Sequence, residues 1–219
     1  WLPAGLQLTA LNLTAAICAS LALVLLARSV ALLPHDRTRE QRGLERSEYS
    51  MLSIPTAWLP PVLAALVCGF QLTFWENAVV ATGEALDLLI FAWLIHCLLQ
   101  YRLDEKESRL HLFALVYGLS ITNNFAMIWF AIPFTVALLW IKGLSFFQWR
   151  FLLRMTLFGL AGLLLYLFLP AVNINNPSGF SFWELLKGYL GYQKESMFAL
   201  PRYIILLTSL TSLLPILFM

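Results

Sequence analysis

The chain has 219 residues, of which 60% are hydrophobic and only 12% are charged, and its mean hydropathy is +0.78. Soluble domains carry about a quarter charged residues, so this composition excludes an ordinary soluble domain and predicts a protein embedded in a lipid bilayer. The formal net charge of +2 is unremarkable, and no nucleic-acid partner is expected.

The apolar runs predict an all-α, polytopic transmembrane helical bundle that forms a single domain over residues 1–219. A span needs about 20 apolar residues to cross a hydrocarbon core of about 30 Å. We expect about seven spans, near residues 6–33, 54–74, 76–101, 110–122, 125–141, 151–172 and 202–219. The chain begins with Trp1 instead of Met and stops at Met219 inside an apolar run, which indicates an internal fragment of a longer protein.

Two segments are too polar to span. Residues 34–53 are charge-dense and are predicted as a solvated loop or a short surface helix. Residues 173–201 combine a turn-rich start with aromatic, basic and acidic side chains, which predicts an interfacial helix. Pro60-Pro61 is expected to bend the second span, because proline removes a helical hydrogen bond.

The third apolar stretch, Leu72–Tyr101, is predicted as one helix that carries acidic residues. Glu84 and Asp87 are three residues apart and share a face, and Glu76 lies about two turns earlier on a similar bearing. Ionisable groups at bilayer depth usually face a protein interior or a wet cavity. We therefore expect these acids to line a polar cleft that opens at Trp75. Alternatively, Glu84 and Asp87 are protonated or hydrogen-bonded and only hold helices together.

Asn123-Asn124 interrupts an apolar run that is too long for one span. The pair predicts either a tight outward turn between the fourth and fifth spans or two interrupted half-helices. Both asparagines are candidates for a substrate pocket, although they equally suit the simple end of a helix.

Basic residues predict the orientation of the spans. If the spans alternate, 11 of the 14 lysines and arginines fall on one side. The positive-inside rule places this side, with its arginine-rich loops, in the cytoplasm. The outer face then receives Trp75, Asn123-Asn124 and the interfacial segment. Its only basic residues are Lys187, Lys194 and Arg202.

Soluble-enzyme motifs are missing from the sequence, which has no Gly-rich phosphate loop, no HExxH and no nucleophile elbow. His96 and His111 have no partner histidine at ligand spacing and are interpreted as packing or interface residues. The three cysteines form no CxxC pair and are interpreted as core-facing thiols. No metal site and no cofactor are identified from the residues.

Several segments resemble the bacterial protein O-mannosyltransferase-like membrane glycosyltransferases, a GT-C family formerly classed as a domain of unknown function. These segments are Leu8–Leu33, LTFWENAVVATGEALDLL (Leu72–Leu89), GLSITNN (Gly118–Asn124) and WFAIPFTVALLW (Trp129–Trp140). The resemblance implies a GT-C-like fold in an integral protein of the bacterial inner membrane. One departure is visible, because many members have a Glu and then a Tyr where this chain has Thr82 and Glu84.

The resemblance also implies a reaction, in which a sugar passes from a polyprenyl-phosphate carrier to an acceptor on the outer face. The catalytic carboxylate of such enzymes lies in the first outer loop, which is expected upstream of residue 1. The fragment alone is therefore expected to be inactive and to supply scaffold, carrier groove and part of the sugar or acceptor pocket. Trp75, Glu76, Glu84, Asp87, Asn123 and Asn124 are the pocket candidates.

A phosphate carrier needs basic groups at the outer interface, and Lys187, Lys194 and Arg202 are the candidates there. These residues also suit an interfacial role, with the charged heads snorkelling to water. Two other functions remain open. Intramembrane acids with a broken helix also suit a proton- or cation-coupled transporter, and a non-catalytic membrane subunit would use the acids to lock its helices.

Overall fold

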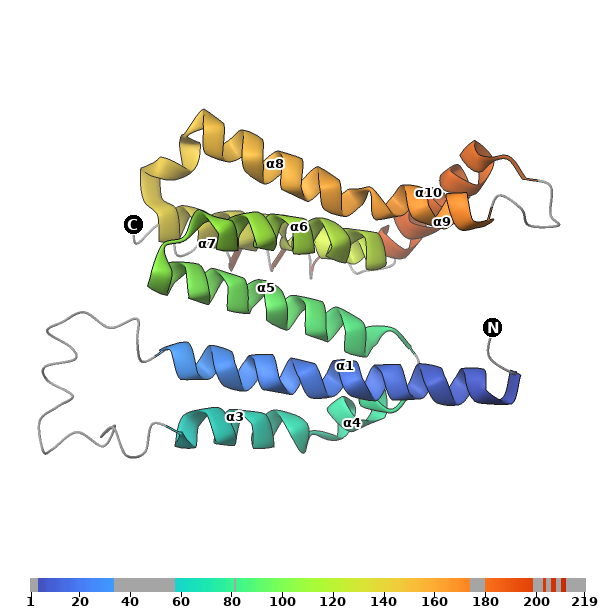
Figure 1. Ribbon diagram of the computed structural model, residues 1–219, viewed down its shortest axis with the longest axis horizontal. Helices are drawn as coiled ribbons and strands as arrows, with labels where there is room; N and C mark the ends of the chain where they lie inside the picture. Colours follow the sequence, from blue (N-terminus) through green and yellow to red (C-terminus); the bar gives the residue numbers. More distant parts are fainter. Residues whose placement is uncertain are drawn as a thin grey trace, which may run out of the picture. The chain divides into compact units, whose positions relative to one another are not determined.

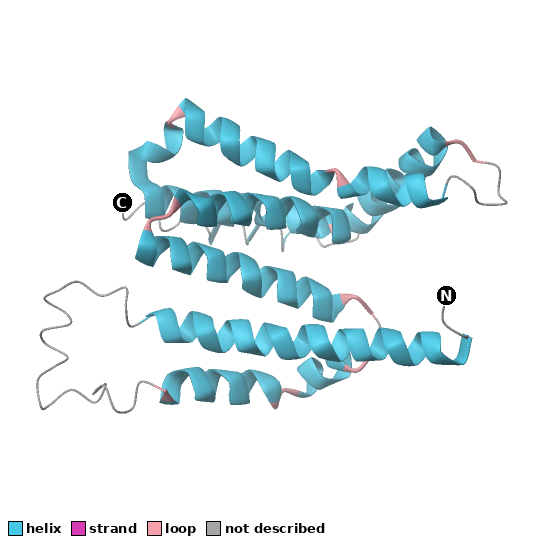
Figure 2. Ribbon diagram, viewed as in Figure 1, coloured by secondary structure: helices cyan, strands magenta, loops and turns pink. Residues whose placement is uncertain are grey.

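The computed structural model describes residues 4–33, 58–80, 82–173 and 180–198, together with positions 203, 206, 207, 210 and 211. Every regular element within these residues is a helix, which confirms the predicted all-α class (Figure 2). The chain divides into two compact units, Trp1–Arg109 and Leu110–Met219, which are described separately below.

The first unit is built around a long helix that contacts the other three. Its helices are α1 (Ala4–Leu32), α3 (Leu59–Gly69), α4 (Leu72–Ala78) and α5 (Glu84–Asp104). Helix α1 packs against α3, α4 and α5. Helices α1 and α5 run parallel to each other, and α3 runs in the opposite direction (Figure 1).

Small side chains allow α1 and α5 to lie close together. Ala15, Ala19 and Ala22 recur on one face of α1 and are buried, and Ala19 packs in one cluster with Ala85 of α5. Further along both helices, the Ser29 hydroxyl lies 3.1 Å from Nδ1 of His96. Helices in lipid gain little from the hydrophobic effect, so close backbone packing and such polar contacts hold them together.

The chain bends twice before α5, and both bends differ from the predictions. Pro60-Pro61 does not bend the helix, because the pair lies in the first turn of α3, where a missing N–H group breaks no helical bond. The bend of 72° lies instead between α3 and α4. The predicted single helix from Leu72 to Tyr101 is also wrong. Gly83 has φ of +84°, a left-handed conformation that interrupts a right-handed helix, and α5 begins after it.

The second unit contains most of α6 and all later elements. Its helices are α6 (Glu107–Asn123), the 3₁₀ helix η3 (Phe125–Phe130), α7 (Ala131–Lys142), the 3₁₀ helix η4 (Gly143–Phe147), α8 (Trp149–Leu163), α9 (Leu165–Asn173) and α10 (Phe182–Phe198). Helix α6 ends at Asn123, at the predicted break. The side chain of Asn124 then accepts a hydrogen bond of 3.1 Å from the backbone N–H of Ala126 and caps η3.

An aromatic cluster joins α6 to α7 across this break. The Phe134 ring of α7 meets Phe113 and Tyr117 of α6 edge-on, at centroid distances of 5.2 and 5.5 Å. The Tyr117 hydroxyl donates a hydrogen bond of 2.9 Å to the carbonyl oxygen of Met127 in η3. The break is therefore a turn held by packed rings, as the first of the two alternatives predicted, and its outward direction stays a prediction.

Glycines bring α6 and α8 into backbone contact. A Cβ atom added to Gly118 would overlap the carbonyl oxygen of Gly159 and come within 3.0 Å of the Cα atom of Gly162. A Cβ atom on Gly162 would come within 2.8 Å of the backbone nitrogen of Leu119. Thr122 donates a hydrogen bond of 3.0 Å to the carbonyl oxygen of Gly118 in the same crossing.

The C-terminal carbonyls of α6 are satisfied by side chains from two later helices. The hydroxyl of Tyr166 on α9 lies 2.9 Å from the Ile121 carbonyl oxygen and 2.6 Å from Oε1 of Gln193 on α10. Nε2 of Gln193 donates a hydrogen bond of 3.2 Å to the Thr122 carbonyl oxygen. These bonds matter because the last four carbonyls of a helix have no partner inside it. They fix α10 to the end of α6.

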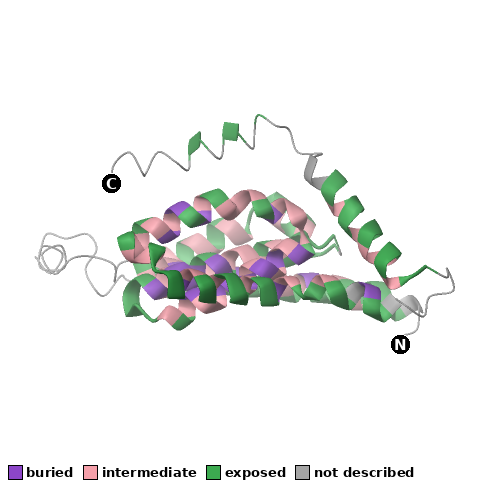
Figure 3. Ribbon diagram, turned by 90° about the horizontal axis from the view of Figure 1, so that it is seen from above, coloured by how far each residue is buried: buried purple, intermediate pink, exposed green. Residues whose placement is uncertain are grey.

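Four described helical segments are long and apolar enough to cross a membrane, and the bent pair α3–α4 makes a fifth candidate. Large apolar side chains such as Leu8, Leu13 and Val67 are more than 60% exposed, as suits contact with lipid (Figure 3). The count of seven spans stays a prediction. Helix α6 has 17 residues, at the short limit for a span, while the predicted loop 34–53 and most of the predicted span 202–219 lie outside the described residues.

The α6–α8 crossing gives a stability prediction. Replacing Gly118 with Ala forces the two backbones apart, and overpacking of this kind costs about 1–3 kcal/mol. Gly188→Ala is the control, because Gly188 lies in helix α10 with open space around its Cα atom. We expect Gly118→Ala to lower the thermal unfolding midpoint in detergent and Gly188→Ala to leave it unchanged or raise it. Equal midpoints for both variants would show that the close crossing does not exist.

The start of α10 gives a pH prediction. The Ser181 N–H donates a hydrogen bond of 2.8 Å to the Glu184 carboxylate, which lowers the pKa of Glu184 from its ordinary value of 4.5. A lowered pKa in the folded state means that this bond stabilises the helix start above about pH 4.5 and is lost as the pH falls through the lower folded value. Hydrogen exchange at the start of α10, corrected for intrinsic rates, should rise on acidification.

Glu184→Gln provides the control for this measurement, because glutamine serves in the same capping box but does not titrate. Its exchange should not respond to acid. An acid-induced rise in exchange of equal size in the unmodified protein and in Glu184→Gln would contradict the assignment of this rise to Glu184.

Candidate functional site

A cavity of about 290 Å³ lies in the first unit, between α1, the α3–α4 bend and the start of α5. Its lining residues are Ala19, Cys68, Gln71, Thr73, Phe74, Asn77, Ala78, Glu84, Ala85 and Leu88. The polar members come from the bend and the helix start, and the apolar members come from the helix walls. Such a mixture, a mainly apolar wall with a few convergent polar groups, is typical of a ligand site.

Glu84 owes its position to the interruption before α5. It is the first residue of α5, directly after the left-handed Gly83, and its side chain is exposed. Among the described residues the Glu84 side chain has no hydrogen-bond partner. A carboxylate at a helix N-terminus is stabilised by the helix dipole, so Glu84 and Asp87 also help α5 to begin here.

A second, apolar cavity of about 230 Å³ adjoins the first. Its lining residues are Ala22, Leu23, Leu26, Ser29, Cys68, Phe74, Leu88, Phe91, Ala92 and Ile95. Cys68, Phe74 and Leu88 line both cavities. The first unit therefore has a polar pocket that is continued by an apolar one along α1 and α5.

The wall of the apolar cavity includes one hydroxyl that belongs to a polar pair. Ser29 lines this cavity, and its hydroxyl contacts His96, whose side chain is 6% exposed. A buried imidazole needs such a partner. His96 is therefore tied to its neighbouring helix, in the packing role that its sequence context suggested.

The pocket brings together only part of the predicted acidic stripe. Glu84 lines it, but Glu76 and Trp75 are exposed on α4 and Asp87 is half-buried, and none of these three belongs to the lining. Asp87 has an interaction partner within the structure. The three acids do not share one helical stripe, because residues 79–83 separate the helix of Glu76 from that of Glu84.

Three polar residues of the pocket were not predicted as site residues. Gln71 precedes α4, and Thr73 and Asn77 are four residues apart on it. The Asn77 side chain donates a hydrogen bond of 2.9 Å to the Thr73 carbonyl oxygen. The spacing of Thr73 and Asn77 beside Trp75 was the available signal, since residues four apart share a helical face.

The remaining candidates belong to the second unit. Asn123 is exposed at the end of α6, and the side chain of Asn124 caps η3. Lys187 and Lys194 are exposed on α10. Arg202 lies outside the described residues. Within the described parts of the chain, no group of three or more His, Cys, Asp or Glu side chains could hold a metal ion.

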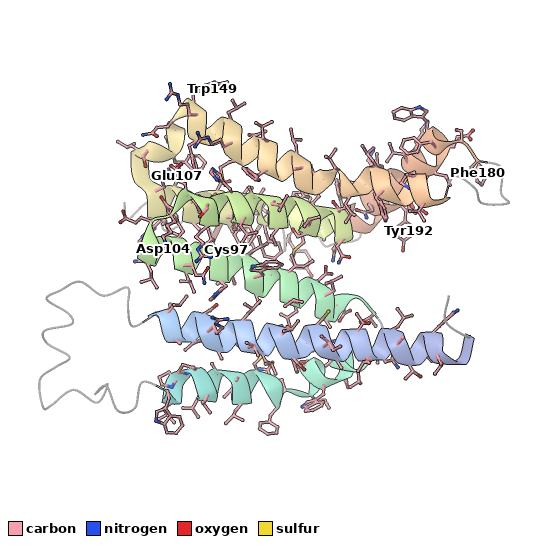
Figure 4. All side chains as sticks on the ribbon, in the orientation of Figure 1. Cys97, Asp104, Glu107, Trp149, Phe180 and Tyr192 are labelled. Carbon is pink, nitrogen blue, oxygen red and sulfur yellow. The ribbon has the colours of Figure 1, made fainter. Side chains whose placement is uncertain are left out.

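The described arginines of the first unit lie at the end opposite the pocket. Arg28 lies near the C-terminal end of α1 and Arg102 near that of α5, whereas Glu84 begins α5. Because α1 and α5 run parallel, the two arginines lie toward the same end of the unit. Asp104 also lies there, 3.5 Å from Nε of Arg109, and Figure 4 labels it at the end of α5.

Comparisons with known proteins place the chain in a family. No curated protein and no solved structure matches it. The family model described as the protein O-mannosyl-transferase TMEM260 N-terminal domain matches residues 1–146, which include the whole first unit and its pocket. The chain therefore belongs to the family of the protein O-mannosyl-transferase TMEM260 N-terminal domain.

Proposed function

We propose that the chain is part of a membrane-embedded glycosyltransferase of the O-mannosyltransferase type, which uses a polyprenyl-phosphate sugar as donor and an acceptor on the outer face. The family match supports an O-mannosyltransferase-type activity. The observation that carries the finer proposal is the paired cavity of the first unit, in which a polar pocket adjoins an apolar one.

The polar pocket suits the sugar. Sugar hydroxyls donate and accept hydrogen bonds, and a carboxylate accepts strong ones. The pocket residues that offer such groups are Glu84, Gln71, Thr73 and Asn77. We assign Glu84 to binding and orienting the sugar, and we assign the catalytic carboxylate to the outer loop that the family resemblance places upstream of residue 1. Trp75 and Glu76, on the same short helix as Asn77, are proposed to lie near the mouth.

The apolar cavity suits the first part of a prenyl chain. Its lining is formed by aliphatic and aromatic side chains together with the Cys68 thiol and the Ser29 hydroxyl. Transfer of apolar surface into such a cavity is favourable by about 25 cal/mol per Å². Leu88 lies where the two cavities meet, so it would contact the donor close to the join between head and tail.

The charge distribution supports an outward-facing pocket. The end of the first unit that carries Arg28 and Arg102 is the cytoplasmic end under the positive-inside rule. The pocket at the start of α5 then opens toward the opposite face. An acceptor on the outer face could reach it there.

Removing the pocket carboxylate should reduce transfer. In the full-length protein we expect Glu84→Gln to lower kcat/KM for sugar transfer by about ten- to a hundredfold, because a hydrogen bond to a charged group contributes about 1.5–3 kcal/mol. Glu105→Gln is the matched control, because it makes the same change just after the other end of α5, outside the pocket lining. The measurement is the rate of transfer from a polyprenyl-phosphate sugar in reconstituted membranes.

If a folded Glu84→Gln protein transfers sugar as fast as Glu105→Gln does, Glu84 is not part of the site. A loss of equal size in both variants would point to destabilised α5, and thermal unfolding would check this.

Filling the junction between the cavities should affect the lipid part of the donor. We expect Leu88→Trp to raise KM for the donor, with a larger increase for a long-chain carrier than for a short-chain one, because the ring blocks the passage of the tail. Leu86→Trp is the matched control, since Leu86 is on the same helix with similar exposure (38% against 40%) and lines neither cavity. An increase that does not depend on chain length would contradict a tail in this cavity.

A further inference from the structure

The helix α10 has two flanks of opposite charge beside the face by which it is docked. Its less exposed side chains fall on one face at 100° per residue, and they are Phe182, Leu185, Leu186, Tyr189 and Gln193. Gln193 bonds to the end of α6. Helix α10 also contacts α9 and η3. The remaining surface of the helix is available for contacts outside the unit.

One flank combines apolar and cationic groups. Trp183, Lys187, Leu190 and Lys194 follow each other at spacings of four, three and four residues, so they form one stripe of about 60° width. Trp183 is 73% exposed and Leu190 is 43% exposed, and both lysines are exposed. Figure 3 shows α10 with exposed residues along its length.

The other flank is acidic. Glu184 and Glu195 lie about 60–100° further around the helix from the lysines, and Gly188 and Gly191 lie between them along the chain. Glu184 is turned toward the helix start, where it accepts the hydrogen bond from Ser181. Lys187 therefore does not form an ion pair with Glu184, although the two are three residues apart. Within the described residues, neither lysine of the stripe forms an ion pair with Glu184 or Glu195.

We propose that this stripe of Trp183, Lys187, Leu190 and Lys194 binds the anionic phospholipid headgroups of the membrane surface. Charge complementarity identifies the partner, because juxtamembrane lysines are attracted to anionic lipid. The residue types of the stripe also support this partner. Tryptophan prefers the level of the lipid headgroups. Lysine stems cover apolar surface while their charged heads reach the lipid phosphates. The acidic flank then faces water. The two lysines bind bulk phospholipid in this arrangement, and the phosphate of a sugar carrier is the competing occupant.

Spin labels on the two flanks test the proposal in the full-length protein. Cys18, Cys68 and Cys97 are replaced by Ala, and a single label is attached through Leu190→Cys or Gly188→Cys. Gly188 lies toward the acidic flank and has open space around it, so its label is the matched control. The protein is reconstituted in nanodiscs of neutral phosphatidylcholine or of phosphatidylcholine with phosphatidylglycerol. Collision rates with oxygen, which concentrates in lipid, and with a nickel chelate, which stays in water, are measured.

We expect the label at position 190 to collide more with oxygen and less with the nickel chelate in anionic nanodiscs, whereas the label at 188 stays aqueous in both. Lys187→Gln with Lys194→Gln should abolish the difference between the two nanodisc types. Lys187→Arg with Lys194→Arg should retain it, and high salt should reduce it.

Three results would overturn the proposal. The label at 190 could be as aqueous as the label at 188 in both lipids. A folded protein with Lys187→Gln and Lys194→Gln could still show the full difference between neutral and anionic nanodiscs. The label at 190 could respond to added polyprenyl phosphate but not to phosphatidylglycerol, which would assign the lysines to the carrier.

Discussion

The backbone break between α4 and α5 determines the architecture of the first unit. A continuous helix from Leu72 would have placed its acids along one stripe. The left-handed Gly83 instead restarts the helix at Glu84, and the α3–α4 bend folds Gln71 and Asn77 toward that new start. The new N-terminus also stabilises the carboxylate beside it. One glycine conformation thus supports both the cavity and its charge.

Polar backbone groups impose a similar constraint on the second unit. The end of α6 is followed at once by a turn, so its last carbonyls need partners from elsewhere in the fold. Tyr166 and Gln193 supply them from two different helices. The glycines of α6 and α8 bring those two backbones so close that the Thr122 hydroxyl also lies 3.5 Å from the Gly162 carbonyl oxygen of α8. The docking of α10 is therefore a consequence of how α6 ends. The two flanks of α10 beside its docked face can then contact lipid or water.

Sequence patterns predicted some of these features and missed others for identifiable reasons. The lengths of the apolar runs predicted an all-α membrane protein, because a helix that crosses the apolar bilayer core must itself be apolar over its length. The Asn123-Asn124 break was also predictable, since asparagine caps helices. The break before Glu84 was not predicted, because Thr82-Gly83 lies in an apolar context and one glycine is tolerated in many helices. That error extended to the site, because it aligned Glu76 with Glu84 and Asp87, which do share α5. It also overlooked Gln71 and Thr73, whose positions depend on the bend.

The central claim is that the paired cavity of the first unit holds a lipid-linked sugar. Photo-crosslinking tests it most directly, using the full-length protein and a polyprenyl-phosphate sugar with a photoreactive group in the first prenyl units. Peptide mapping should find adducts in the segments that contain Phe74, Leu88 and Ile95, and excess unlabelled donor should suppress them. Adducts that the donor suppresses only in segments outside α1, α3, α4 and α5 would contradict the account.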